Sequence, residues 1–238
     1  MTADIPTPPP RAEFLRGARD QLPIRLGVVP FGIIFGALAL DNGLPADTIL
    51  GFSFFVFAGS AQFIAAELIA GGAPAFITVL TIAVVNLRHL LYSASLGPAL
   101  QPLHAGWRWA LSWLLTDEAF ATASVHYRRH PNPNAHWYLL GTGLALWGSW
   151  QASTLAGVVL GAALPVSWNL SFALPLTFLA LLIPLLADRP TVLSAISAGF
   201  AGMLLAGLPF RLGLLFAAFI GIAVGYFAER AHLSGEAS

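Results

Sequence analysis

The 238-residue sequence contains no cysteine, and all eleven of its basic residues are arginine. The lack of cysteine excludes disulfides and thiolate chemistry, and the lack of lysine excludes a Schiff-base mechanism. Only 9% of the residues are charged, whereas soluble domains carry about 25%. With 57% hydrophobic residues and a mean hydropathy of +0.77, the chain cannot cover its surface with polar groups. Composition therefore predicts a polytopic membrane protein, and the zero net charge argues against a nucleic-acid surface.

Common catalytic and metal-binding motifs are also missing. The sequence has no Walker loop, no HExxH and no GxSxG element. The stretch HYRRHPNPNAH (126–136) holds three histidines, but it crosses two prolines. A solvated, positively charged anchor on the cytoplasmic side explains it better than a metal site does. The sequence therefore predicts no metal, no cofactor and no enzyme.

Apolar runs broken by glycine, proline and charge predict an all-α, polytopic transmembrane bundle of about eight spans, with seven as the alternative. The runs lie near 25–40, 47–70, 75–97, 108–126, 137–163, 171–187, 190–208 and 212–228. The first and sixth are short for a membrane crossing and contain Pro30, Pro175 and Pro184. The expected organisation is a cytoplasmic tail with an interfacial helix (1–24), a single transport domain (25–230) and a second cytoplasmic tail (231–238).

The distribution of arginine predicts the orientation of the chain. With the N-terminus inside, eight arginines fall in inner segments and two, Arg108 and Arg211, in outer ones. This follows the positive-inside rule, so we expect a cytoplasmic N-terminus.

The first 24 residues combine a proline-rich tail with a short amphipathic segment. On a helix, one face of this segment carries the apolar residues Phe14, Leu15, Ala18 and Leu22. The segment lacks the apolar run of a signal peptide. We therefore expect a helix lying on the membrane surface, followed by a first span that is retained.

The stretch VVNLRHLLY (84–92) puts an asparagine, an arginine and a histidine in the middle of the third apolar run. A charge at the bilayer centre costs roughly 2.5–3.5 kcal/mol on insertion scales, so it must pair, meet water or face the bundle interior. On a helix, Asn86 and His89 share one face, and Arg88 and Tyr92 form the neighbouring stripe. Arg88 either ties helices together or contacts substrate, and the two roles are compatible.

Two adjacent carboxylates, Asp117 and Glu118, lie near the centre of the fourth run, WALSWLLTDEAFATAS. They point about 100° apart on a helix, so at least one should face the interior and seek a cation, for which Arg88 is the obvious candidate. The other is expected to exchange protons. Asp117 is the stronger candidate for proton coupling, while Glu118 alternatively only hydrogen-bonds a neighbouring helix.

The second run contains FAGSAQF (57–63), in which small residues and an amide interrupt an apolar helix. Small residues allow close helix packing, which is one interpretation. The other is a helix break, whose freed N–H groups would bind a carboxylate together with Gly59, Ser60 and Gln62.

Pro30 and Gly32 in the first run are predicted to form a matching break, because proline removes an intrahelical bond. Glu67, near the end of the second run, is expected to reach toward the inner interface. The stretches 34–45 and 159–170 resemble each other faintly as an internal repeat. The glycine motifs around the following residues are predicted to pack helices: Gly27, Gly32, Gly36, Gly157 and Gly161.

Four motifs stand in the order PFG (30–32), FAGSAQF (57–63), NLRHLLY (86–92) and LLTDEAF (114–120). In this order and spacing they resemble the AzlC-type large subunit of bacterial branched-chain amino acid exporters. The likeness is strong over about residues 20–125 and limited to length and hydropathy over 137–230. It implies export of valine, leucine, isoleucine and similar neutral amino acids across the bacterial inner membrane. Because the sequence has no nucleotide-binding motif, the proton gradient is the expected source of energy. It also implies a small membrane subunit of the AzlD type as partner, and leaves a homo-oligomer open.

Glu67 departs from the family pattern, in which a neutral residue is expected at that position. This leaves the identity of the cargo open.

The predicted mechanism is alternating access around a cavity near the middle of the membrane. The residues expected to line the substrate site are Gly59, Ser60, Gln62, Asn86, His89 and Tyr92. Asp117, with Glu118, would meet the ammonium group or exchange a proton, and Arg88 would hold Asp117 deprotonated. Two other classes are a non-transporting membrane scaffold or assembly subunit, and an intramembrane hydrolase that uses Ser60 with His89.

Overall fold

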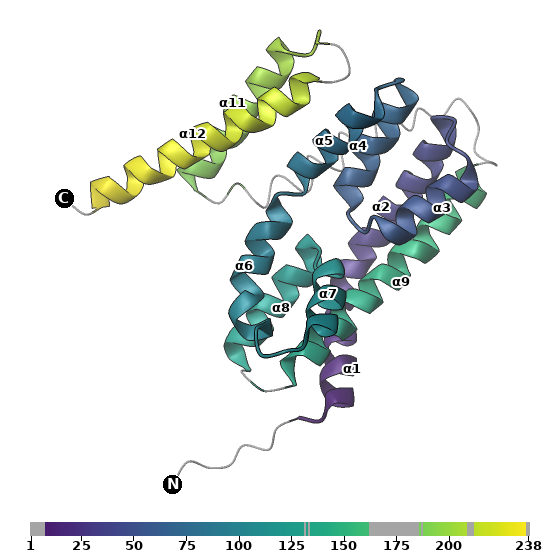
Figure 1. Ribbon diagram of the computed structural model, residues 1–238, viewed down its shortest axis with the longest axis vertical. Helices are drawn as coiled ribbons and strands as arrows, with labels where there is room; N and C mark the ends of the chain where they lie inside the picture. Colours follow the sequence, from purple (N-terminus) through teal and green to yellow (C-terminus); the bar gives the residue numbers. More distant parts are fainter. Residues whose placement is uncertain are drawn as a thin grey trace. The chain divides into compact units, whose positions relative to one another are not determined.

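The computed structural model describes residues 8–130, 132, 134–161, 186, 188–208 and 212–236, and every regular element in these ranges is an α-helix (Figure 1). This confirms the all-α prediction. The helices of the described part are α1 (Pro10–Asp20), α2 (Leu22–Asp41), α3 (Ala46–Phe55), α4 (Gly59–Ala70), α5 (Ala75–Val85), α6 (Arg88–Leu100), α7 (Ala105–Trp113), α8 (Asp117–Arg129), α9 (Ala135–Gly161), α11 (Arg189–Leu204) and α12 (Leu212–Glu236).

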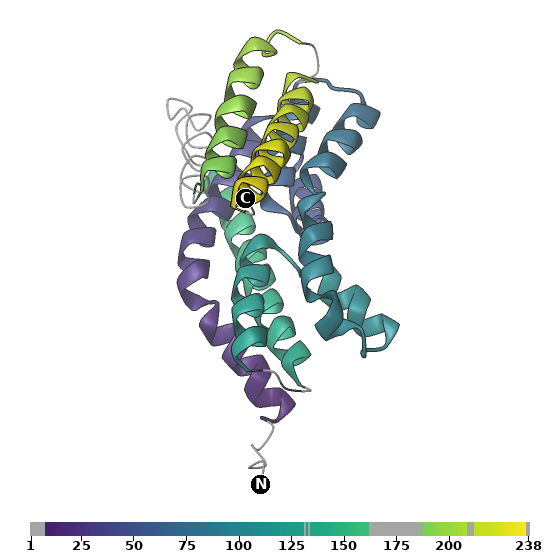
Figure 2. The same cartoon turned by 90° about the vertical axis from the view of Figure 1, so that its left-hand side faces the viewer.

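The chain divides into two compact units, residues 1–66 with 85–168 and residues 67–84 with 169–238. The first unit is built around α9, whose 27 residues extend for about 40 Å at 1.5 Å per residue. Figure 2 shows α1 and α2, in purple, following one another along α9, in green. The same helix also contacts α3, α7 and α8, while α6 packs on α8.

Glycines allow α1 and α2 to approach α9 closely. A Cβ atom on Gly36 would lie 2.3 Å from the carbonyl oxygen of Thr154, and one on Gly157 would lie 2.2 Å from that of Ile33. Gly32 and Gly161 are in similarly close contact with α9 and α2, so their predicted packing role is confirmed. The prediction for Gly27 is wrong, because this residue is exposed and a Cβ atom on it would have nothing within 4 Å.

The apolar face predicted for α1 is not the face that is buried. Glu13 and Gly17 are the buried residues of this helix, whereas Leu15 is 41% exposed. Gly17 packs against the backbone of Tyr138 in α9, where a Cβ would lie 2.2 Å from the carbonyl oxygen. Contact with α9 therefore determines which side of α1 is covered.

Three of the predicted spans are interrupted. The second run is split into α3 and α4 at residues 56–58, as one of the two interpretations of FAGSAQF expected. The third is split into α5 and α6 at residues 86–87, and the fourth into α7 and α8 at residues 114–116. The prediction of continuous helices was wrong for these two runs, so Asn86 lies at a break and Asp117 begins a helix.

The first run, in contrast, has no break. α2 continues from Leu22 to Asp41 with Pro30 inside it. The predicted break at Pro30 and Gly32 is therefore wrong. Pro30 is exposed and lacks an N–H donor, but the surrounding turns are held by the close contact of Gly32 with Ser153 of α9, where a Cβ would lie 2.0 Å from Oγ.

The second unit contains α11 and α12, which pack against each other in antiparallel fashion. Gly221 of α12 lies against Ala198, Gly225 lies against Ser194, and Ser194 Oγ donates to the carbonyl oxygen of Gly221 at 2.8 Å. Asp188 caps the first turn of α11 by accepting from the backbone N–H of Thr191.

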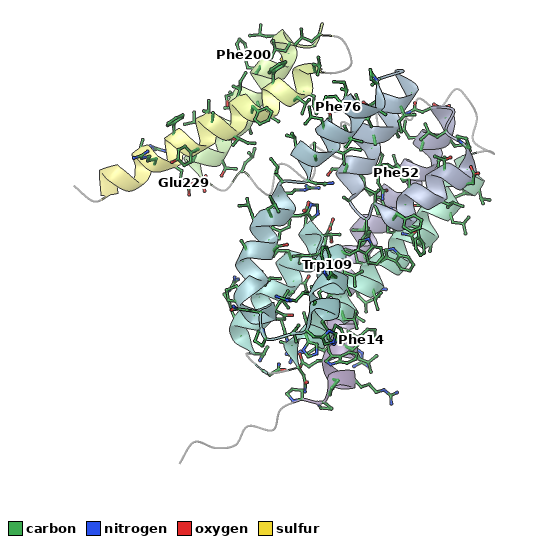
Figure 3. All side chains as sticks on the ribbon, viewed as in Figure 1. Phe14, Phe52, Phe76, Trp109, Phe200 and Glu229 are labelled. Carbon is green, nitrogen blue, oxygen red and sulfur yellow. The ribbon has the colours of Figure 1, made fainter. Side chains whose placement is uncertain are left out.

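Large apolar side chains are exposed in both units. Trp109 in the first unit is 79% exposed, and Phe76 and Phe200 in the second are 74% and 64% exposed (Figure 3). Such side chains suit contact with hydrocarbon.

By length and composition, two described helices can cross a membrane, α2 and the Leu212–Ala231 part of α12, or three if α5 and α6 form one broken span. Several predicted features lie outside the described residues: the run 171–187 except residue 186, including Pro175 and Pro184, most of the repeat stretch 159–170, and Arg211.

Candidate functional site

Three helices of the first unit begin at one cluster of polar side chains. Arg88 is the first residue of α6, Asp117 is the first residue of α8, and Ser60 is the second residue of α4. Arg88 Nη1 lies 2.7 Å from Asp117 Oδ2, and Arg88 Nη2 donates to Ser60 Oγ. The pairing of Arg88 with a carboxylate of the fourth run is thus confirmed, and the break of the second run supplies a third member.

Some polar atoms of this cluster make no hydrogen bond in the described part of the chain. Asp117 Oδ1, Arg88 Nε and Asn86 Oδ1 are covered atoms without a hydrogen-bond partner in the described part of the chain. The side chains of Arg88 and Asp117 nevertheless remain 32% and 41% exposed. Covered polar groups normally find partners, so these three atoms are hydrogen-bonding groups that a polar ligand would satisfy if the exposed parts of Arg88 and Asp117 moved to admit it.

The helix starts add positive potential to the same place. The first N–H groups of a helix have no intrahelical acceptor and lie at the positive end of the helix dipole. The starts of α4 and α8 can supply such groups here, whereas at α6 the N–H groups of His89 and Leu90 already donate to backbone carbonyl oxygens. All three starts are linked through Arg88, and Asp117 is the nearby acidic partner. The geometry suits a ligand that brings both a carboxylate and a cation.

The start of α8 is set by its own sequence. Thr116 is the N-cap, and its side chain accepts from the backbone N–H of Ala119 at 3.3 Å. Asp117 and Glu118 then occupy the first turn, where negative charge is favourable. Thr followed by two acidic residues is an N-terminal helix signal, and this signal could have located the break from sequence.

Aromatic side chains form one wall beside the cluster. Tyr92 stacks on Phe120 with ring centroids 4.5 Å apart, and its phenol neighbours Asp117. The His89 ring contacts Tyr92 edge-on and makes a hydrogen bond of 3.2 Å with the carbonyl oxygen of Asn86. In the described part of the chain Ser60 Oγ bonds to Arg88 and the His89 ring bonds to the carbonyl oxygen of Asn86, and these two side chains do not form the hydrogen-bonded pair that a hydrolase would need.

Gln62 lies away from this wall and is fully buried. Its Nε2 donates to the carbonyl oxygen of Val56, and its Oε1 accepts from Trp150 Nε1 at 3.0 Å. Gly59 packs against the same Trp150 and against Phe31, where a Cβ would lie 3.0 and 3.3 Å from the two rings. Both residues therefore position the break between α3 and α4.

The backbone carbonyls that end α3 receive side-chain donors from three other helices. Gln151 donates to Ser53, Trp147 to Phe54, Trp113 to Phe55 and Gln62 to Val56. A helix end leaves its last carbonyls without intrahelical donors, and hydrocarbon supplies none. These four donors, which we call the carbonyl-capping set, make a broken helix tolerable inside a membrane. The sequence reasoning missed three of them, although a tryptophan N–H in an apolar helix needs a partner.

The all-helical architecture and the polar cluster at its helix breaks are those of a membrane protein with discontinuous helices. The AzlC protein family matches residues 23–164, more than half of the chain and including all three breaks, so the chain belongs to this family of membrane proteins.

Relatives share this length and character. The Inner membrane protein YgaZ of Escherichia coli K12 is 30% identical over 217 residues, which cover 87% of this chain and 89% of that protein. An uncharacterised membrane protein of Archaeoglobus fulgidus is 31% identical over 193 residues, covering 79% and 82%. The Branched-chain amino acid transport protein AzlC of Bacillus subtilis is 27% identical over 158 residues, covering 63% and 59%. No solved structure matches the chain.

Proposed function

We propose that the protein is a secondary active transporter that exports branched-chain amino acids across the bacterial inner membrane. The observation that carries the proposal is the Ser60–Arg88–Asp117 cluster at the starts of three helices. Discontinuous helices that meet at polar groups are a common way for transporters to build a substrate site. The name of the Bacillus subtilis relative supports the substrate class.

The cluster can accept a zwitterion by exchanging partners. Without substrate, Arg88 contacts Asp117 and Ser60. A substrate carboxylate would replace Asp117 and Ser60 as the acceptor for Arg88, helped by the free N–H groups at the start of α4. The substrate ammonium group would replace Arg88 as the partner of Asp117. Every charge keeps an opposite partner during this exchange, so no charge has to be left bare in hydrocarbon.

The aliphatic side chain of the substrate would rest on the Tyr92–Phe120 wall, with Asn86 and His89 at its polar margin. Gln62 and Gly59 act indirectly by holding the α3–α4 break. Selectivity for a branched side chain then depends on the apolar surface, and recognition of the amino-acid backbone depends on Arg88 and Asp117.

Proton coupling is assigned to Asp117. A proton on Asp117 Oδ1, the oxygen without a protein partner, would weaken the ion pair with Arg88 and free the guanidinium. Glu118, in the same helix turn, is the second carboxyl group that can take part. Export in this scheme proceeds by alternating access, with a cytoplasmic N-terminus and an AzlD-type small membrane subunit as partner.

The test is proton-driven flux of radiolabelled valine in proteoliposomes, with and without the small subunit. Asp117→Asn keeps the shape of the side chain but removes its charge and its proton exchange, so we expect proton-driven flux to fall at least tenfold. Asp41→Asn, the same change at an exposed residue at the end of α2, is the matched control. Undiminished proton-driven flux in Asp117→Asn would remove this residue from the mechanism. No flux from the wild type with its partner would favour a scaffold or assembly subunit.

A further inference from the structure

A second polar pocket lies at the opposite end of α8 from Asp117, between α1, α8 and α9 of the first unit. Its volume is about 420 Å³, within the range of about 300–1,000 Å³ that small-molecule sites occupy. None of its lining residues belongs to the Ser60–Arg88–Asp117 cluster. The pocket includes part of the histidine-rich stretch for which the sequence predicted only an anchoring role.

The pocket presents charges of both signs. Arg16, Arg129 and His130 line it as basic groups, and Asp20 lines it as the acidic group. Arg16 Nη2 donates to His130 Nε2 at 3.2 Å. Arg129 has no ion-pair partner among the residues that the structure describes. Its guanidinium can therefore receive a carboxylate without breaking an internal ion pair.

The acidic group, Asp20, is held in position by a hydrogen bond from Tyr138. Tyr138 OH donates to Asp20 Oδ2 at 2.8 Å, which leaves the other carboxylate oxygen for a ligand. The Tyr138 ring stacks on His126 with centroids 3.6 Å apart and an interplanar angle of 1°. His126 Nε2 in turn donates to Glu13 Oε2 at 2.7 Å, and both of these side chains are nearly fully buried. This buried chain of contacts fixes the pocket floor, so the site is built before a ligand arrives.

Apolar side chains complete the lining. Ile24, Ala121 and Val125 face the same pocket from the α2 and α8 sides. A bare anion site would need only the basic groups, and a cation site only Asp20. One chemical class, a zwitterionic aliphatic amino acid, matches this lining, because the three basic groups suit its carboxylate, Asp20 suits its ammonium group and the aliphatic wall suits its side chain.

We propose that this pocket is a second amino-acid site, in which an aliphatic amino acid binds before or after it occupies the Arg88–Asp117 cluster. The proposal rests on the proposed transport function for its role, but its geometry is independent of that cluster. α8 joins the two sites, since its 13 residues extend for about 20 Å. Thr122 lines the pocket, and its Oγ1 lies 2.8 Å from Gln21 Oε1 and 2.9 Å from the carbonyl oxygen of Glu118, next to Asp117, so that its one hydroxyl proton serves one of these two acceptors at a time.

The experiment is equilibrium binding of radiolabelled leucine to the full-length protein in phospholipid nanodiscs. We expect two leucine molecules per wild-type chain. Arg129→Gln should weaken one of the two binding events at least tenfold. Arg128→Gln is the matched control, because Arg128 is the exposed neighbour in sequence and does not line the pocket. Asp20→Asn, which keeps an acceptor for Tyr138, should weaken the same event, and thermal unfolding checks that each variant folds.

Two analogues test recognition of the zwitterion. 4-Methylpentanoate lacks the ammonium group of leucine, and 3-methylbutylamine lacks its carboxylate. Each should compete at least tenfold more weakly than leucine for the event that Arg129→Gln impairs. Equal competition by 4-methylpentanoate would show a simple anion site and overturn the assignment to amino acids.

The variants separate this proposal from the transport site. A single binding event that is lost in Asp117→Asn and unchanged in Arg129→Gln and Asp20→Asn overturns the second site and leaves the transport site standing. A single event that is lost in Arg129→Gln and kept in Asp117→Asn supports the pocket and contradicts substrate binding at the cluster. Absence of leucine binding to folded wild-type protein overturns both.

Discussion

Arg88 is the residue on which the candidate site depends, because its guanidinium joins groups from two other helices. It contacts Asp117 at the start of α8 and Ser60 at the start of α4. This single side chain therefore fills the first role considered for it, as a tie between helices, and the second, contact with substrate, belongs to the function proposed above. The pairing with Asp117 was predictable from sequence, because a charge in a membrane span needs an opposite partner and few candidates existed.

Arg88→Lys should lower valine flux at least tenfold while the protein still inserts and folds. A lysine keeps the charge, but its single ammonium group lacks the planar fork that lets arginine bond two partners at once. The measurement is flux in proteoliposomes, normalised to the amount of folded protein. Arg108→Lys, at an exposed position of α7, should transport normally. Normal flux in Arg88→Lys would show that charge alone is sufficient at this position.

The structural role of Gln62 could not be predicted from the sequence. An amide in an apolar stretch was correctly singled out as unusual, but its position in the fold depends on Trp150, 88 residues further along the chain. No local pattern links these two residues. The structure shows both ends of the amide bonded within the protein, so in the proposed mechanism Gln62 holds the helix break and does not contact the substrate directly.

At the scale of helices, the breaks are the feature that creates the site. Hydropathy predicted the positions of the apolar runs but treated the third and fourth as continuous, because a window average is insensitive to a two- or three-residue interruption. The break before α8 has a local cause in Thr116 and the acidic residues after it. The break predicted at Pro30 is absent, because tertiary packing of α2 against α9 outweighs the local loss of one intrahelical hydrogen bond.

Thr116→Ala should destabilise the protein by about 0.5–2 kcal/mol, because it removes the side-chain acceptor that caps α8. Thr116→Ser keeps the hydroxyl and should restore most of the lost stability. Thermal unfolding in detergent measures both variants. If Ala and Ser unfold at the same temperature, the capping hydrogen bond is not what determines where α8 begins.

Gly157→Ala should destabilise the protein by about 1–3 kcal/mol through overpacking, since its Cβ would lie 2.2 Å from the carbonyl oxygen of Ile33. Gly148 provides the matched control on the same helix, because nothing lies within 4 Å of a Cβ at that position. Gly148→Ala should be neutral or slightly stabilising, as alanine favours helices. Equal unfolding temperatures for the two variants would contradict the close contact between α2 and α9.

At the scale of the whole molecule, the sequence predicted the architectural class and the family, but not how the spans are built. The AzlC match agrees with the four motifs, which depend on local residue order. The number of crossings is harder to predict, because broken helices are each shorter than a bilayer. Orientation depends on arginine placement across the entire chain, and this prediction can be tested directly.

The absence of cysteine makes the orientation test simple, since the wild-type protein gives no background with a thiol reagent. Asp41→Cys and Arg129→Cys introduce single thiols at exposed positions near the ends of α2 and α8. With a cytoplasmic N-terminus, a membrane-impermeant reagent should label Asp41→Cys in intact spheroplasts and Arg129→Cys only in inverted vesicles. Labelling of both from the same side, or the reverse order, would contradict the predicted orientation.

The carbonyl-capping set has a consequence for how this protein can diverge. Its donors come from α4, α7 and α9, yet they serve consecutive carbonyls at the end of α3. Replacing any one donor strands an oxygen in an apolar surrounding, so such a change can persist only when a second change supplies a new donor to the same oxygen. Across homologues, the residues at 62, 113, 147 and 151 should therefore change in a correlated manner, even though they are widely separated in the chain.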